Sequence, residues 1–243
     1  MDPRDIFLHS YTSLYILNCI KENKMTHERV PETDQGIQGT VTIAHYDEMQ
    51  RHLRDKGWIE TQAIIKSGIR GGHALEIGHG PGYLGLEWLK FTEDTRLTGL
   101  DISPDMTALA VQNARSYGFE SRTHYEGGRG NDLPFTNDTF DGVFTNGSLH
   151  EWSDPEGTFS EIFRVLKSGG HYFISDLRRD MSVFIRWFLW LGCQPTSIRP
   201  YLFTSIKAAY IPFELKEMVE KTCLRNASVA GNLFGLWISG QKQ

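Results

Sequence analysis

Three glycines in one short stretch form the pattern that is most informative about chemistry. Gly78, Gly80 and Gly82 alternate with other residues between a predicted strand and a predicted helix. Glycine permits a tight turn and lets the backbone approach a bound molecule closely. The helix that follows offers free N–H groups and the positive end of its dipole. Because ligands of open α/β sheets bind at the carboxyl ends of the strands, this stretch predicts a ligand site.

The same stretch permits two other interpretations. The hexapeptide at positions 80–85 fits GxGxxG, the dinucleotide-binding pattern, and Asp101 follows about 20 residues further on. This match favours an NAD(P)-dependent oxidoreductase. A glycine-rich turn between strand and helix that binds no ligand is the third interpretation.

Alternating strands and helices position these residues. Short apolar runs bounded by turn residues predict strands, and apolar residues three or four apart predict helices. Such alternation is typical of a mostly parallel sheet with helices on both faces. The predicted strands are 73–77, 96–100, 122–125, 140–145 and 171–175, followed by a closing pair at 227–230 and 234–239. The predicted helices are 4–24, 46–66, 83–91, 104–117, 155–166 and 212–223, with a polar loop at 26–40.

Residues 74–170 resemble the class I S-adenosylmethionine-dependent methyltransferases, especially the small methyltransferase type 11 group. Positions 74–82 look like the first motif of that group, with the acidic Glu76 ahead of the first glycine. Positions 100–106 look like its second motif. The resemblance covers less than half of the chain and continues at 133–135, 140–141, 149–152 and 165–170.

The resemblance implies a fold and a reaction. The expected fold is α/β, a doubly wound seven-stranded mostly parallel sheet (Rossmann-like) with a helical cap and an antiparallel member in its last strand pair. The expected reaction transfers a methyl group from S-adenosylmethionine to a small molecule or a protein side chain, which the sequence does not identify. Residues 1–243 then form one methyltransferase domain, with an N-terminal helical cap (1–70), a cofactor-binding core (71–176) and a cap insert with closing strands (177–243).

The resemblance also implies roles at the amino-acid end of the cofactor. Gly78, Gly80 and Gly82 would let the loop pass beside that end, and Glu76 would orient the loop or meet the ammonium group. Asn146, just past the fourth predicted strand, would reach the same end of the cofactor, although it could equally be a turn residue.

Other residues are implied for the nucleoside end. Asp101 would accept hydrogen bonds from both ribose hydroxyls, and it could also cap the next helix. Ile102 and Met106 would flank the adenine, with core packing as the alternative. Tyr46, in a Tyr-Asp pair upstream of the first motif, would close over the cofactor or pack on the core.

One position departs from the pattern of the family. The family commonly has Gly-Asp-Ala before the Leu-Pro-Phe segment, and its acidic residue reaches the adenine amine. This chain has Gly128, Arg129 and Gly130 there, and an arginine side chain cannot accept a hydrogen bond. We therefore expect the adenine to meet the backbone of Arg129 and Gly130, or else Asn131 or Asp132.

The sequence predicts catalytic residues less clearly than cofactor-binding residues. Methyl transfer from a sulfonium needs an aligned nucleophile, and a general base matters only when the acceptor arrives protonated. His150, after the fourth predicted strand, is the catalytic candidate, with a structural or solvated histidine as the alternative. The nine histidines form no HxH or HExxH spacing, so we expect no metal.

Composition limits the remaining function classes. A net charge of −5 argues against a nucleic-acid backbone as partner. The odd set of Cys19, Cys193 and Cys223, without a CxxC pair, indicates a reducing, cytoplasmic location. The N-terminal charge pattern does not fit a signal peptide, and no apolar run approaches the ~18 residues of a membrane span. The alternative that is not an enzyme is a partner subunit that binds the cofactor but does not catalyse a reaction.

The segment Phe184–Leu191 is apolar almost all round. Such a helix is expected to be buried, to pair with another chain in a homodimer, or to line an apolar pocket. We expect it to pack in the core. The pocket alternative would indicate an acceptor that is at least partly apolar.

Overall fold

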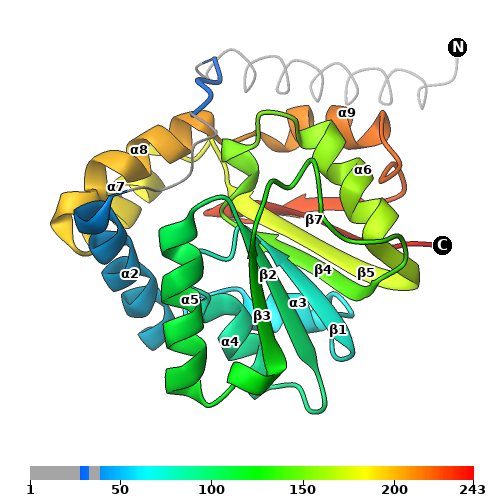
Figure 1. Cartoon of the computed structure of the whole chain (residues 1–243). Coiled ribbons are helices and arrows are strands. Elements are labelled where there is room, and N and C mark those ends of the chain that lie inside the picture. Colours follow the sequence, from blue (N-terminus) through cyan, green and yellow to red (C-terminus); the bar gives the residue numbers. More distant parts are fainter. Residues whose placement is uncertain (1–27, 33–38) are drawn as a thin grey trace, which may run out of the picture.

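The computed structural model describes residues 28–32 and 39–243 (Figure 1). The helix expected at 4–24 and most of the loop expected at 26–40 lie outside these residues. Among the described helices, none has both the length and the apolarity that crossing a membrane requires.

A seven-stranded sheet with the order β3-β2-β1-β4-β5-β7-β6 forms the centre of the molecule. β1 to β5 pair in parallel, whereas β7 pairs antiparallel with both β5 and β6. The predicted fold class, including the antiparallel closing strands, is thereby confirmed. The strands are β1 (His73–Ile77), β2 (Arg96–Asp101), β3 (Thr123–Gly127), β4 (Phe140–Asn146), β5 (Leu166–Leu177), β6 (Ser228–Gly231) and β7 (Gly235–Gln241).

Helices cover both faces of the sheet, and each face has its own apolar core. On one face α6 (Pro155–Val165) and α9 (Pro212–Glu220) bury their apolar sides against the strands. On the other, α3 (Thr61–Lys66), α4 (Tyr83–Lys90) and α5 (Pro104–Tyr117) do the same. Neighbouring residues of one strand therefore enter different cores.

Glycine ends the second predicted helix early. The sequence predicted one helix over 46–66, but the structure has α2 (Thr40–Asp55) and the separate α3. Gly57 lies between them in the left-handed region with φ +68°, which a helix cannot continue through. The single long helix was therefore wrong.

One more predicted boundary was wrong, and one helix was missed. The last residue of the predicted helix 155–166 belongs to β5, which begins at Leu166 and continues through two glycines. The ladder with β4 shifts register between Phe140 and Gly142, which accommodates this irregular stretch. α8 (Arg199–Ala208) was not predicted at all.

The apolar helix α7 (Val183–Gly192) does not pack in the core. None of its residues is buried, and Phe184 and Trp187 are 84% and 60% exposed. The expected core packing was therefore wrong, because apolar composition alone does not specify what covers a helix. The Trp190 ring lies 4.2 Å from the Arg199 guanidinium of α8, and Phe188 contacts Phe234.

Candidate functional site

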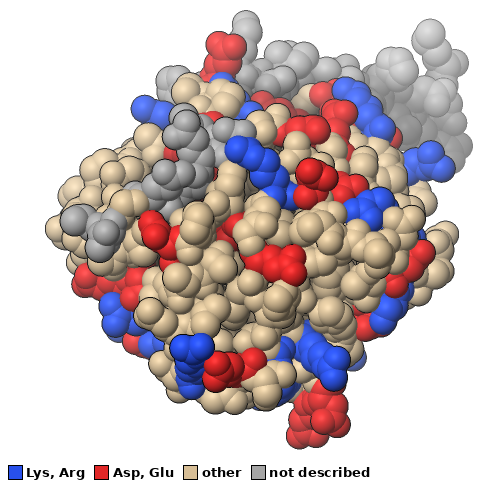
Figure 2. Space-filling view, in the orientation of Figure 1, with Lys and Arg blue, Asp and Glu red and all other residues tan. Residues whose placement is uncertain are grey.

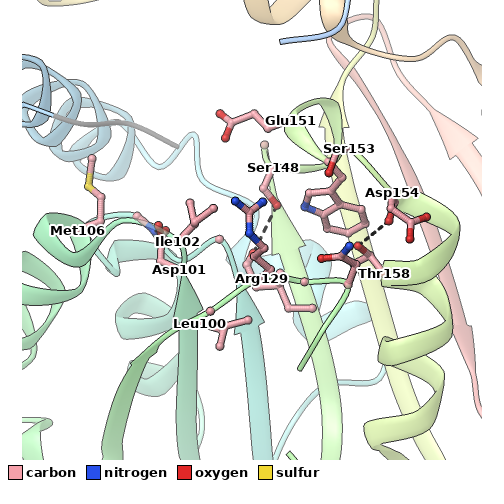
Figure 3. A pocket seen from close by; sticks show the side chains of 18 of the residues that line it. Leu100, Asp101, Ile102, Met106, Arg129, Ser148, Glu151, Ser153, Asp154 and Thr158 are labelled. Atoms are coloured by element: carbon pink, nitrogen blue, oxygen red, sulfur yellow. Dashed lines mark hydrogen bonds between the residues drawn. The ribbon is translucent and has the colours of Figure 1, made fainter. Parts of the chain in front are cut away.

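A pocket opens at the carboxyl ends of β1, β2 and β4 (Figure 3). Met106 and Ile102 stand on the α5 side of it, and Asp154 and Thr158 stand on the α6 side. On the face shown in Figure 2, Lys and Arg are interspersed with Asp and Glu and form no continuous basic surface. The pocket is lined by Tyr46, Ile77, Gly78, Gly80, Leu100, Asp101, Ile102, Met106, Gly128, Arg129, Gly130, Asn131, Gly147, Ser148, Glu151, Trp152, Ser153, Asp154 and Thr158.

The glycine loop between β1 and α4 forms one wall of the pocket. Gly78 has φ +69° and donates its N–H to the Leu100 carbonyl over 2.8 Å. A Cβ on Gly78 would lie 2.7 Å from Cβ of Ser148, so a side chain has no room there. The Tyr46 ring packs against Gly80, which has φ +51°. Gly82 is left-handed too, but it precedes α4 as its N-cap residue and does not line the pocket.

Asp101 connects this loop to the next one. Its Oδ2 accepts from the Gly80 N–H at 2.9 Å, and its Oδ1 accepts from the Ser103 N–H at 2.8 Å. A carboxylate oxygen can accept more than one hydrogen bond, so acceptor capacity remains on the pocket side. Ser103, not Asp101, caps α5, by accepting from the Met106 N–H. The interpretation of Asp101 as the cap of this helix is therefore wrong.

Glu76 lies behind the glycine loop and does not line the pocket. The residue is 2% exposed, and its Oε2 has no hydrogen-bond partner among the described residues. Burial, with a smaller contribution from the Asp101 charge, raises the pKa of the Glu76 carboxyl to about 8, and a backbone hydrogen bond from Gly85 opposes this rise. Its predicted contact with the cofactor stays a prediction.

The remaining cofactor candidates fall into two groups. Tyr46, Ile102, Met106, Arg129 and Gly130 all line the pocket, and their contact with the cofactor stays a prediction. Asn146 does not: it is exposed, and its side-chain amide donates to the Ser175 hydroxyl over 2.9 Å. Its neighbours Gly147 and Ser148 line the pocket in its place.

The catalytic candidate His150 is buried beside the pocket, in the short 3₁₀ helix η2 (Leu149–Glu151). Its Nδ1 lies 2.9 Å from both carboxylate oxygens of Asp176, and its backbone N–H donates to the same side chain. Burial disfavours the charged imidazole, but the Asp176, Glu32 and Glu151 carboxylates outweigh it and raise the pKa of His150 to about 10. His150 does not line the pocket, whereas the next residue, Glu151, does.

Sequence reasoning missed the wall that runs from η2 to α6. The resemblance at 149–152 marked this stretch, but it singled out only His150. Helix-start residues such as Asp154, which caps α6 by accepting from the Gly157 N–H, give no sequence signal of facing a ligand. The missed lining residues of this wall are Ser148, Glu151, Trp152, Ser153, Asp154 and Thr158.

Comparison with solved structures supports the fold. The crystal structure of a proposed S-adenosyl-L-methionine-dependent methyltransferase from Methanococcus maripaludis matches with a TM-score of 0.68 at 21% identity. The match covers 86% of this chain and 98% of that one.

Sequence comparison decides the family. A family model for methyltransferase domains matches residues 75–174, which supply most of the pocket. The demethylmenaquinone methyltransferase of Symbiobacterium thermophilum is 27% identical over 72% of this chain and 78% of that protein. The ubiquinone/menaquinone biosynthesis C-methyltransferase UbiE of Geobacter sulfurreducens is 28% identical over 70% of this chain and 69% of that protein.

The chain is a class I S-adenosylmethionine-dependent methyltransferase. The predicted family, enzyme class and cofactor are thereby confirmed. None of these matches supports the nicotinamide-dependent oxidoreductase or the subunit without catalysis. The pocket of this methyltransferase fits the cofactor, because the Gly78 and Gly80 backbone lines it directly and Asp101 has spare acceptor capacity.

We predict that Asp101→Ala weakens S-adenosylmethionine binding by roughly 1–3 kcal/mol, the range for leaving polar partners unpaired. Isothermal titration calorimetry on the folded variant measures the loss. Ser103→Ala is the matched control, because it removes the α5 cap and leaves the Asp101 carboxylate in place. An affinity in Asp101→Ala no lower than in Ser103→Ala contradicts the assignment.

Glu76→Gln is expected to change how stability depends on pH. A carboxyl whose pKa rises from 4.5 to about 8 on folding binds more protons in the folded state, so its ionisation destabilises the fold as pH increases across that interval. The glutamine variant lacks this effect. Its free energy of unfolding, relative to the wild type, should therefore increase from about pH 5 to pH 8.

Urea denaturation at several pH values measures this difference. Glu93→Gln, at an exposed turn position, is the control and should run parallel to the wild type. Parallel profiles for Glu76→Gln and the wild type would show that Glu76 does not hold its proton in the folded state.

Proposed function

We propose that this methyltransferase acts on a small molecule with an apolar body and a quinol-type ring. Two relatives support the ring chemistry, since their names place them in menaquinone and ubiquinone methylation. The observation that carries the proposal is the exposed aromatic face of α7, which packs against α8, the helix that contacts η2 at the pocket wall. α8 contacts η2 and also carries Arg199 against Trp190 of α7.

The cofactor orientation follows from the glycine loop. We assign the amino-acid end to Gly78, Gly80 and the Tyr46 ring, since the ring lies beside the Gly80 backbone there. Asp101 receives the ribose, and Ile102 and Met106 receive the adenine. Arg129 and Gly130 stand where the family places an acidic residue, so the adenine amine is assigned to backbone oxygen at these positions.

This orientation directs the reactive methyl group to the wall formed by Tyr46, Ser148 and Glu151. S-adenosylmethionine supplies a methyl group on a positively charged sulfur, so alignment and water exclusion contribute more than acid–base groups. The Tyr46 hydroxyl accepts a hydrogen bond from Gln50 over 3.0 Å, and this fixes the ring beside Gly80. The acceptor then enters between this wall and the helices α7 and α8.

An acceptor panel with methyl-labelled cofactor tests the proposal. We expect transfer to reduced naphthoquinones and benzoquinones with short isoprenoid tails, and much slower transfer to polar catechols. A basic peptide mixture serves as the protein-acceptor arm. Transfer to the peptides or the polar catechols, with none to the quinols, would contradict the proposal.

The double variant Phe184→Ala/Trp187→Ala is expected to raise the apparent KM for an apolar acceptor about tenfold. The reason is that burying one aromatic side chain contributes roughly 1.5–3 kcal/mol, part of which a ligand would recover. The cofactor Kd and the melting temperature should change little, because neither residue is buried. Phe91→Ala, an exposed aromatic at the opposite end of α4 from the pocket, is the control.

A variant that changes oligomeric state while acceptor kinetics stay unaltered would assign this face of α7 to a homodimer contact and contradict the acceptor role. Size-exclusion chromatography with light scattering measures the oligomeric state.

A further inference from the structure

Three carboxylates converge on one buried imidazole beside the pocket. Asp176 of β5 holds Nδ1 of His150, as described above. On the other side of the ring, Nε2 lies 3.4 Å from Oε2 of Glu32 and 3.9 Å from Oε1 of Glu151. The glutamates come from distant parts of the chain, since Glu32 belongs to the described segment 28–32 and Glu151 to η2.

The His150 Nε2 atom lacks a hydrogen bond although it is buried. The side chain is 5% exposed, and Nε2 has no hydrogen-bond partner among the described residues despite its proximity to both glutamates. A buried nitrogen without a partner costs roughly 1–3 kcal/mol. Nδ1 keeps the proton that it donates to Asp176, and a metal ion would displace the proton on Nε2 and take its place between the ring and the two carboxylates.

Arg29 approaches this cluster without neutralising it. Its guanidinium donates to the carbonyls of His150 and Ala208 and lies over the Tyr210 ring. It therefore satisfies main-chain oxygens and leaves the glutamate oxygens facing Nε2. Hydroxyl groups of α8 complete the surroundings, with Ser205 3.4 Å from Glu32.

We propose that Glu32, His150 and Glu151 bind a divalent first-row transition-metal cation. One ligand atom from each residue lies within 4.8 Å of the other two. Ligands about 2.1 Å from a common ion lie up to roughly 4.2 Å apart, so small rotations of the carboxylates complete the site. One imidazole and two carboxylates suit such ions, and a histidine whose second nitrogen donates to a carboxylate is the usual arrangement at metal sites.

The expectation of no metal came from local histidine spacing, which cannot detect this site. Its ligands belong to two separate segments, and the fold brings them together. A bound ion would join segment 28–32 to η2. Because Glu151 also lines the pocket, a remaining coordination position could hold an acceptor oxygen. That role alone rests on the proposed function, whereas ion binding does not.

The test is Mn²⁺ titration of chelator-treated full-length protein, followed by the electron paramagnetic resonance signal of free Mn²⁺. Mn²⁺ is the probe because it prefers oxygen and imidazole ligands over the cysteine thiols. We expect one ion per chain. His150→Ala and the double variant Glu32→Gln/Glu151→Gln should abolish saturable binding, and Asp176→Asn should weaken it about 10- to 100-fold.

A matched control uses the exposed pair His124 and Glu126, whose side chains lie 2.6 Å apart on β3. The variant His124→Ala/Glu126→Gln should bind Mn²⁺ like the wild type. Circular dichroism checks that each variant folds. If His150→Ala misfolds, Mn²⁺ binding by Glu32→Gln, a change at a partly exposed position, still tests the site. We expect Glu32→Gln to lower the affinity at least about tenfold, the lower end of the range for changes around a metal site.

Absence of binding to the wild type overturns the proposal, as does equal binding to the wild type and to Glu32→Gln. The methyl-transfer assay with and without chelator separates the two proposals. Mn²⁺ binding with chelator-insensitive transfer retains the metal site and removes its role with the acceptor. If the protein binds Mn²⁺ but methylates no quinol of the acceptor panel, the proposed function is contradicted and the metal site stands.

Discussion

The Asp101 carboxylate is the interaction on which the pocket depends. One oxygen holds the Gly80 N–H of the first loop, and the other holds the Ser103 N–H of the second. Because β1 and β2 are parallel neighbours, both loops leave the sheet at the same edge. Remote parts of the pocket depend on this junction indirectly, since the Tyr46 ring rests on Gly80 and Met106 is fixed by the Ser103 cap.

The polar groups around this junction differ in how they are satisfied. Asp101 accepts hydrogen bonds from backbone N–H groups and lines the pocket. Glu76 is buried outside the pocket lining, and its Oε2 has no hydrogen-bond partner among the described residues. His150 combines both situations, with Nδ1 held by Asp176 and Nε2 without a hydrogen bond. Of these three groups only Asp101 lines the pocket, so its carboxylate is the one that can meet a bound cofactor directly.

Local patterns predicted the parallel core and one side of the pocket. The strands at 73–77 and 96–100 and the glycine loop could be identified because their signals lie within a few consecutive residues. The break at Gly57 and the extension of β5 through Gly169 were missed, since glycine permits several backbone conformations. Tertiary partners gave no local signal, as the exposure of α7 and the approach of Glu32 to His150 illustrate.

The two apolar cores share the strands between them. Val143 of β4 enters one core and its neighbour Phe144 enters the other, and Leu75 and Ala74 of β1 do the same. Loosening either layer of helices therefore exposes a side of the strands that support the other layer. Cooperativity is thus built into the sheet: the two layers should melt in one calorimetric transition, and the slowest amide hydrogen exchange should lie in β1 and β4.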